Sequence, residues 1–396
     1  MSTDDEAHRD ELSDEELDIV LARAAQDLLD HLRGVTDPTA TLLAIMACQD
    51  PLPAAENELW PEQGGHTPGS ERGVTLYSRL NLARQRMDTT LVGTVLPEAV
   101  LDEWEARTIR HGERYITATA PLELLTDVLG DFEEIGRLCE QRHPIDRHRR
   151  LHRITAKLAG LIGMLLINLS RWDLARSFFE TARRAAEETE EPALRAWVML
   201  RQSMLPHYYG DPLDSLKLAR AAGDLADKQV CAVRAMAPVA ELRAKARLAQ
   251  QGRDASFSAR DDVLAAAEEA RTRAETVLAA VNGSDPVFGY THRQMFFHLG
   301  EALVELGYFR DGYVYLTQAL KLYDHHEQLD RTLIQLDRAF CRVAGGEPEE
   351  TLRLATQATR ELAPEYRWNI VQRRVRQLES AVALLPARGD AGSAPD

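Results

Sequence analysis

The sequence predicts an all-α fold in which pairs of helices stack into an extended array. Three observations support this prediction. The 396 residues are rich in alanine, leucine, arginine and glutamate, and only 6% are aromatic, a mixture that favours helix over sheet. From about residue 75 onward, apolar residues recur at helical spacing and no segment alternates as a strand would. Units of helix, turn and helix then repeat along the chain, which is typical of solenoids.

The clearest repeat runs from Leu158 to Ala182 and matches the tetratricopeptide pattern, a pair of helices of about 34 residues. FFHLGEALVELGYFRDGYVYLTQAL is a second match. Small residues let two helices cross closely, and aromatic residues fill the wedge beside the crossing. The pattern positions are Gly163, Ser170, Trp172, Ala175, Phe179 and Ala182 in the first repeat, and Gly300, Gly307, Phe309, Gly312, Leu316 and Ala319 in the second.

The remaining repeats are weaker, and their turns are at Gly210, Gly252 and Gly346. From Ser170 onward the turns are 40, 42, 55 and 39 residues apart. The longest interval predicts an elongated helix pair, or an insertion around Asp254–Asp261 or Val281–Val287. The last periodic segment, PEYRWNIVQRRVRQLESAVALL, is typical of a helix that closes the open end of an array. We therefore predict a tetratricopeptide-like α-solenoid, a right-handed superhelix of helix pairs with a C-terminal capping helix.

Composition divides the chain into four parts. Residues 1–48 are expected to form an N-terminal helical segment with a mobile start, and residues 49–74 a Pro/Gly-rich linker or loop. Residues 75–385 carry the tetratricopeptide-like array. Residues 386–396, PARGDAGSAPD, are expected to be a disordered tail.

Charge and cysteine content argue against several classes of protein. The 63 acidic residues exceed the 47 lysines and arginines, which gives a net charge of −16 and makes direct DNA binding unexpected. The four cysteines lie far apart in the sequence and form no CxxC pair, so we expect free thiols in a reducing cytoplasm. They are Cys48, Cys139, Cys231 and Cys341. The acidic N-terminus resembles no signal peptide, and the longest apolar run, Leu158–Leu169, is too short for a bilayer. We expect a cytoplasmic protein without membrane contact.

Catalytic signatures are absent from the sequence. It contains no GxxxxGK[ST], no GxGxxG after a strand, no HExxH and no GxSxG. Its many carboxylates lie on predicted helix surfaces and in turns. We therefore expect a protein that is not an enzyme and that needs no cofactor.

The most basic segment is RHPIDRHRRLHR, from Arg142 to Arg153. Two pairs of possible metal ligands lie here at helical spacing, namely Cys139 with His143 and His148 with His152. The five arginines would repel a cation and Pro144 separates the pairs, so we expect no metal. Nucleic-acid binding would need a basic stripe, preferably with aromatic residues on which bases stack, but the first segment has no aromatic residue other than histidine. A second basic cluster lies on the capping helix and consists of Arg367, Arg373, Arg374 and Arg376 with Trp368.

Helical geometry instead predicts a binding groove. From Pro144 onward, Leu151, Ile154 and Leu158 fall on a core stripe, while Arg149 and Arg153 point the opposite way, toward the concave surface of an array. Similar positions in later helices are Trp197, Arg201, Met204, His207, Tyr208, Arg243 and His298. Aromatic, methionine and arginine side chains together suit a peptide or an amphipathic small molecule with a carboxylate or phosphate. The alternative is that the apolar members fill the interior and the arginines pair with neighbouring acids.

The segments VLPEAVLDEWEARTIRHGERY, LAGLIGMLLINLSRWDLARSFFETARRAAEET and LRAWVMLRQSMLPHYYGDPLDSLKLARAA resemble the tetratricopeptide sensor region of actinobacterial Xre-type transcriptional regulators. The resemblance covers about residues 95–385. In that family an N-terminal helix-turn-helix binds DNA and the helical array receives a signal. Residues 1–95 contain no recognisable helix-turn-helix pair, so the resemblance implies a regulatory, ligand-receiving module.

We therefore expect a regulatory protein that binds a peptide, a small molecule or a protein segment in its concave groove and acts in transcriptional or developmental control. The ligand would bridge successive repeats and shift the curvature or the oligomeric state of the array. A protein–protein adaptor with no small ligand is the alternative, and a homodimer is left open.

Overall fold

The computed structural model describes Arg84 and residues 96–117, 120–253, 260–281, 287–343, 347–360, 362, 364–367 and 370–383. The predictions for residues 1–48, 49–74 and 386–396, and for the turn at Gly346, lie outside these residues. All regular secondary structure within the described ranges is helical. None of the helices that the structure describes is both long and apolar enough to cross a membrane.

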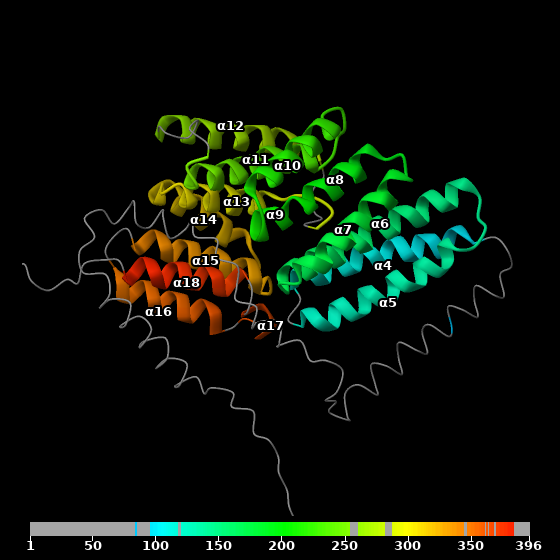
Figure 1. The fold of residues 1–396 in the computed structure, drawn as a ribbon, viewed down its shortest axis with the longest axis horizontal. Coiled ribbons are helices and arrows are strands. Elements are labelled where there is room, and N and C mark those ends of the chain that lie inside the picture. The colour runs from blue at the N-terminus through cyan, green and yellow to red at the C-terminus, as the bar shows by residue number, and fades with distance from the viewer. Residues whose placement is uncertain are drawn as a thin grey trace, which may run out of the picture.

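The helices follow one another along an elongated, curved array (Figure 1). Their bounds are α4 (Glu98–Thr117), α5 (Pro121–Cys139), α6 (Ile145–Asn168), α7 (Trp172–Glu187), α8 (Pro192–Gln202), α9 (Met204–Tyr209), α10 (Pro212–Ala226), α11 (Val233–Gln250), α12 (Arg260–Leu278), α13 (His292–Glu305), α14 (Phe309–Leu322), α15 (Gln328–Val343), α16 (Pro348–Arg360), α17 (Pro364–Arg367) and α18 (Ile370–Ala383).

Local sequence explains where several helices begin and end. Proline begins α5, α8 and α10, where no intrahelical amide bond is lost. Asp211 caps α10 by accepting a hydrogen bond from the Leu213 amide, and Thr291 with Gln294 forms a capping box at α13. Gly252 and Gly307 follow α11 and α13 with φ angles of 67° and 81°, a region that glycine adopts without strain.

The two strongest repeats form the predicted close helix pairs. A Cβ atom added at Gly163 of α6 would lie 2.8 Å from the Phe179 ring of α7, and one at Gly300 of α13 would lie 2.7 Å from Leu316 of α14. The small residues therefore permit both crossings, as predicted. The predicted wedge role of Trp172 is wrong, because its side chain is 49% exposed. Phe309, at the matching position, does pack inward, against Phe340.

The 55-residue interval between turns contains α12 and α13, and the predicted insertions around Asp254–Asp261 and Val281–Val287 lie largely outside the described residues. Residues 287–291 are the end of the connection from α12 to α13. They return to the inner side of the array, where Val287 and Tyr290 are fully buried. The Trp197 indole of α8 donates to the Val287 carbonyl at 3.0 Å, and a Cβ added at Gly112 of α4 would lie 2.9 Å from the Phe288 ring. This connection therefore ties the middle of the array to its first helices.

The C-terminal segment covers the last helix pair. α18 packs on α15 and α16, and Val371, Leu378 and Val382 are buried there. The predicted capping segment is divided into the short α17 and the longer α18. Helix pairs, close crossings and this cover confirm a tetratricopeptide-like α-solenoid with a C-terminal capping helix.

Candidate ligand-binding cavity

A cavity lies on the inner side of the array, where its first helices face its last ones. We call it the inner cavity. Its volume is about 70 Å³, enough for roughly five water molecules or for a small polar group. It is lined from α4, α6, α8, α9, α11, α13, α15 and α18, and from the connection before α15, by Tyr115, Ile116, Met164, Asn168, Arg201, Met204, Tyr208, Met236, Arg243, Arg293, Gln294, Phe297, His298, Tyr323, Glu327, Leu329, Asp330, Leu333 and Ile370.

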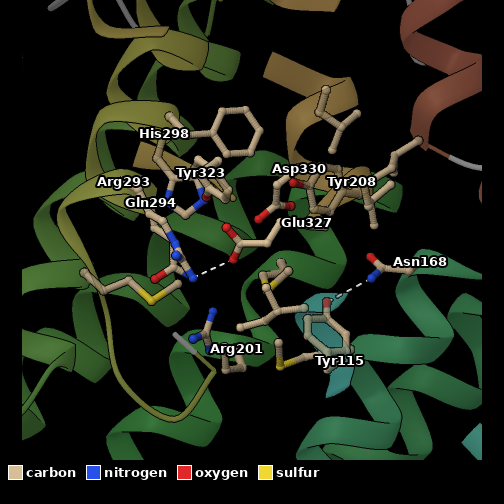
Figure 2. A pocket seen from close by; sticks show the side chains of 18 of the residues that line it. Tyr115, Asn168, Arg201, Tyr208, Arg293, Gln294, His298, Tyr323, Glu327 and Asp330 are labelled. Carbon is tan, nitrogen blue, oxygen red and sulfur yellow. Dashed lines mark hydrogen bonds and ion pairs between the residues drawn. The ribbon is translucent and has the colours of Figure 1, made fainter. Parts of the chain in front are cut away.

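Five of the nine residues predicted for the groove line this one cavity. They are Arg201, Met204, Tyr208, Arg243 and His298. Figure 2 shows that polar side chains from distant parts of the chain converge on it. Three arginines and a histidine stand near two acids, while methionine, leucine and phenylalanine supply apolar wall. Such a mixture can orient a ligand through a few polar groups within an apolar surface.

Two other predicted residues lie beside the cavity and do not line it. Trp197 is buried against Gly160 and donates to the Val287 carbonyl. His207 is 3% exposed and lies 3.6 Å from Glu301. Both side chains are buried in protein contacts next to the cavity lining. They therefore fit the alternative in which the apolar and aromatic residues fill the interior.

Arg149 and Arg153 lie away from the inner cavity, at the N-terminal end of α6. Arg149 pairs with Glu190 at 2.5 Å. Arg153 donates to Glu191 at 2.7 Å and to Glu105 at 3.2 Å. Both guanidinium groups are thus engaged by carboxylates, as in the ion-pair alternative.

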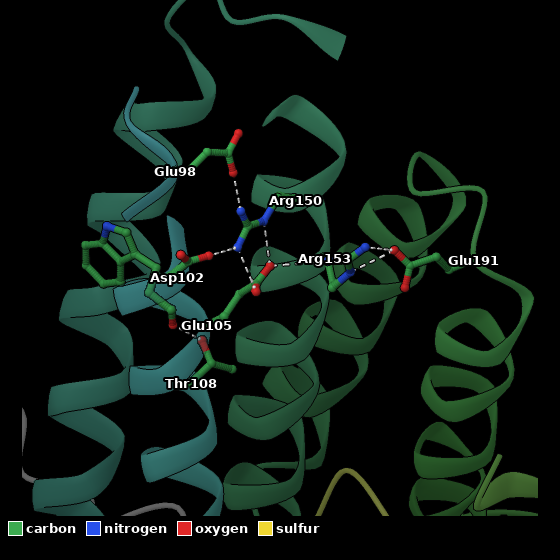
Figure 3. Close-up of polar contacts among 8 residues, drawn as sticks. Glu98, Asp102, Glu105, Thr108, Arg150, Arg153 and Glu191 are labelled. Carbon is green, nitrogen blue, oxygen red and sulfur yellow. Dashed lines mark hydrogen bonds and ion pairs between the residues drawn. The ribbon is translucent and has the colours of Figure 1, made fainter. Parts of the chain in front are cut away.

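Arg150, which the sequence did not single out, is the most connected residue of this region (Figure 3). It donates to Glu98, Asp102 and Glu105 at 2.5, 2.6 and 2.9–3.0 Å. We call this set the outer network, which consists of Arg149, Arg150, Arg153, Glu98, Asp102, Glu105, Glu190 and Glu191. It joins α4 and α6 to the turn before α8. The basic stretch of the sequence is therefore partly neutralised by acids of neighbouring elements.

The residues weighed as possible metal ligands, for which no metal was expected, contact one another and a threonine. His143 and His148 contact edge to face at 5.4 Å, and His148 stacks on His152 at 6.1 Å between ring centroids. The Cys139 thiol lies 3.8 Å from the Thr155 hydroxyl.

Buried charges on one side of the inner cavity belong to arginine. Arg243 is 5% exposed, pairs with Glu301 at 2.6 Å and donates to the Tyr208 hydroxyl at 3.1 Å. Burial would raise the pKa of Glu301, but Arg243 and His207 hold it well below its usual range. Burial, together with Arg243, lowers the pKa of His298 well below its ordinary value, so this imidazole is neutral at pH 7.

Acidic residues also line the inner cavity. Arg293 pairs with Glu327 at 2.5 Å and its guanidinium lies over the Tyr323 ring (Figure 2). Burial raises the pKa values of Glu327 and Asp330 above their ordinary values. The cavity thus offers arginine, a neutral imidazole and carboxyl groups of raised pKa to a ligand.

The sequence did not predict Arg293, Tyr323, Glu327 or Asp330 as site residues. Tyr323 and Glu327 lie in the connection between α14 and α15, outside any helical face. Arg293 and Asp330 lie in the first turns of α13 and α15. A periodic pattern cannot identify them, because their position depends on how the repeats curve around one another.

Fold and cavity together define this chain as a tetratricopeptide-like helical array that encloses a charged inner cavity. No family model matches the chain, and no curated protein matches its sequence. A Rap protein solved in complex with Competence and Sporulation Factor is similar in structure, with a TM-score of 0.44 and 12% identity. The similarity covers 69% of this chain and 78% of that one.

Proposed function

We propose that this chain is a regulatory binding protein whose inner cavity receives part of a ligand, namely a peptide, a small molecule or a segment of another protein. The observation that carries the proposal is the convergence of Arg201, Arg243 and His298 with acids and methionines from eight helices. Burying charged groups costs free energy unless they are paired and hydrogen-bonded, so a gathering of charges in an interior is unusual. A group that bridges these helices would couple its binding to the curvature of the array.

The same observation favours binding over catalysis. The charged groups meet mainly in ion pairs and carbonyl contacts, such as Arg293–Glu327 and Arg201 with the Val287 carbonyl. We accordingly propose a non-enzymatic role in transcriptional or developmental control, in the cytoplasm and without direct DNA binding. The role as an Xre-type regulator stays a prediction from the sequence.

Native mass spectrometry of the protein purified from its own cells tests the proposal. We expect a bound species that is lost on denaturation, and we expect Met204→Trp, which fills the cavity, to abolish its capture. Val314→Trp is the matched control, because Val314 of α14 is 51% exposed. Capture of the same species by wild type and Met204→Trp would contradict binding in this cavity. A co-purified protein without any small molecule would instead identify an adaptor.

A further inference from the structure

A second, smaller cavity adjoins the inner cavity, with Tyr208, Phe297, Leu333 and Ile370 lining both. Its volume is about 40 Å³, enough for roughly three water molecules. Arg247, Glu301, Asp337, Arg373, Arg374 and Gln377 complete its lining. A small polar group would therefore fit here, in continuity with a ligand in the inner cavity.

Arg247, Arg373 and Arg374 line this second cavity, and Arg243 lies beside it as the partner of Glu301. Three of these four arginines have a carboxylate of their own. The pairs are Arg243 with Glu301 at 2.6 Å, Arg247 with Glu305 at 3.0 Å, and Arg374 with Asp337. We call these six residues, together with Arg373, the inner cluster. Four cations thus face three acids.

Arg373 is the fourth arginine, and the three carboxylates of the cluster pair with the other three. It projects from α18 and donates to the Tyr208 carbonyl at 2.6 Å, across 165 positions of the sequence. None of the carboxylates in the described part of the chain forms an ion pair with it. A partly buried guanidinium without a carboxylate is costly, because a carbonyl replaces its hydration only in part.

Arg374 adds an unused donor to the same cavity. Its side chain is 10% exposed, its Nε donates to Asp337, and its Nη1 donates to Gln377 at 3.1 Å. Its Nη2 is buried and has no hydrogen-bond partner in the described residues. A surplus positive charge and a free buried N–H thus border one cavity, from adjacent positions of α18.

We propose that the second cavity is an oxyanion subsite, in which Arg373 and Arg374 bind a carboxylate or a phosphate group. The proposal rests on the proposed function, since the anionic group would belong to the ligand of the inner cavity. An oxyanion supplies an acceptor for the Arg374 Nη2 and a negative charge beside Arg373. Arginine donates to such groups in a planar fork. The capping helix would then be a binding element as well as a cover.

Acetate and inorganic phosphate are the probes of this subsite, each titrated into the full chain by calorimetry at an ionic strength fixed with sodium chloride. We expect saturable binding of one or both, and the tighter anion shows whether the subsite favours carboxylate or phosphate. Arg373→Gln should weaken that binding roughly tenfold or more. Arg353→Gln is the matched control and should bind as wild type does, because Arg353 is 61% exposed on α16.

Absence of saturable binding for both anions, or equal affinity in wild type and Arg373→Gln, would overturn the subsite. If Arg373→Gln does not fold, Arg373→Lys replaces it. That variant keeps the charge and loses the fork, so its affinity should fall by a smaller factor, and an unchanged affinity overturns the proposal. Native capture of an uncharged ligand without anion binding would reject the subsite and leave the proposed function standing.

Discussion

Two groups of arginines in this molecule have opposite surroundings. In the outer network, Arg150 contacts three acids, of which Glu98 and Asp102 are more than half exposed. In the inner cluster, Arg374 and Asp337 have side chains that are 10% and 4% exposed. Water screens the outer charges, whereas the inner charges depend on one another. We therefore expect burial, more than the number of contacts around an arginine, to determine how much that arginine contributes to stability.

The largest expected effect lies in the inner cluster. Arg374→Met leaves the Asp337 carboxylate buried without its cation, so we expect the free energy of unfolding to fall by about 3–5 kcal/mol. Urea denaturation measures this loss, with Arg353→Met as the exposed control. A loss in Arg374→Met that is no larger than in the control would show that the two groups of arginines do not differ.

A second difference is in pH dependence. Burial raises the pKa of Asp337 from 3.8 to about 6, even though Arg374 lies beside it. A carboxyl group with a raised pKa in the folded state stabilises the fold most below its unfolded pKa of about 4, and this stabilisation is lost as pH rises through about 6. Wild type should therefore lose stability relative to Asp337→Asn between these pH values. Thermal denaturation across this range measures the difference, and Asp214→Asn, exposed on α10, is the control.

The smallest effect is expected in the outer network. Arg150→Met should lower the free energy of unfolding by about 0.5–1 kcal/mol at low salt, and by less at high salt. Denaturation at two sodium chloride concentrations tests both statements. A loss as large as that of Arg374→Met, or one that salt leaves unchanged, would mean that the outer network is structurally as important as the inner cluster.

For one arginine group the sequence predicted the position and left two roles open, namely ligand binding and pairing with neighbouring acids. Helical geometry located Arg149 and Arg153 on one face of α6, but acids from α4 and the turn before α8 engage them. Arg373 and Arg374 belonged to a basic cluster that the sequence suggested only for nucleic acid. In the structure both line the second cavity. The face of a helix on which a residue lies depends on nearby sequence. The acid that pairs with an arginine comes from another element of the fold, so nearby sequence does not identify it.

The sequence by itself determined the repeat architecture. Proline and capping residues begin the helices, and Gly163 and Gly300 allow the crossings, because backbone preference and side-chain size act over a few residues. Only the tertiary structure decided which groups meet inside. Tyr208 and Arg373 are 165 positions apart, and their contact depends on the cumulative curvature of every repeat between them. Small rotations between helix pairs add up along a solenoid, so no local pattern records where its two ends face each other.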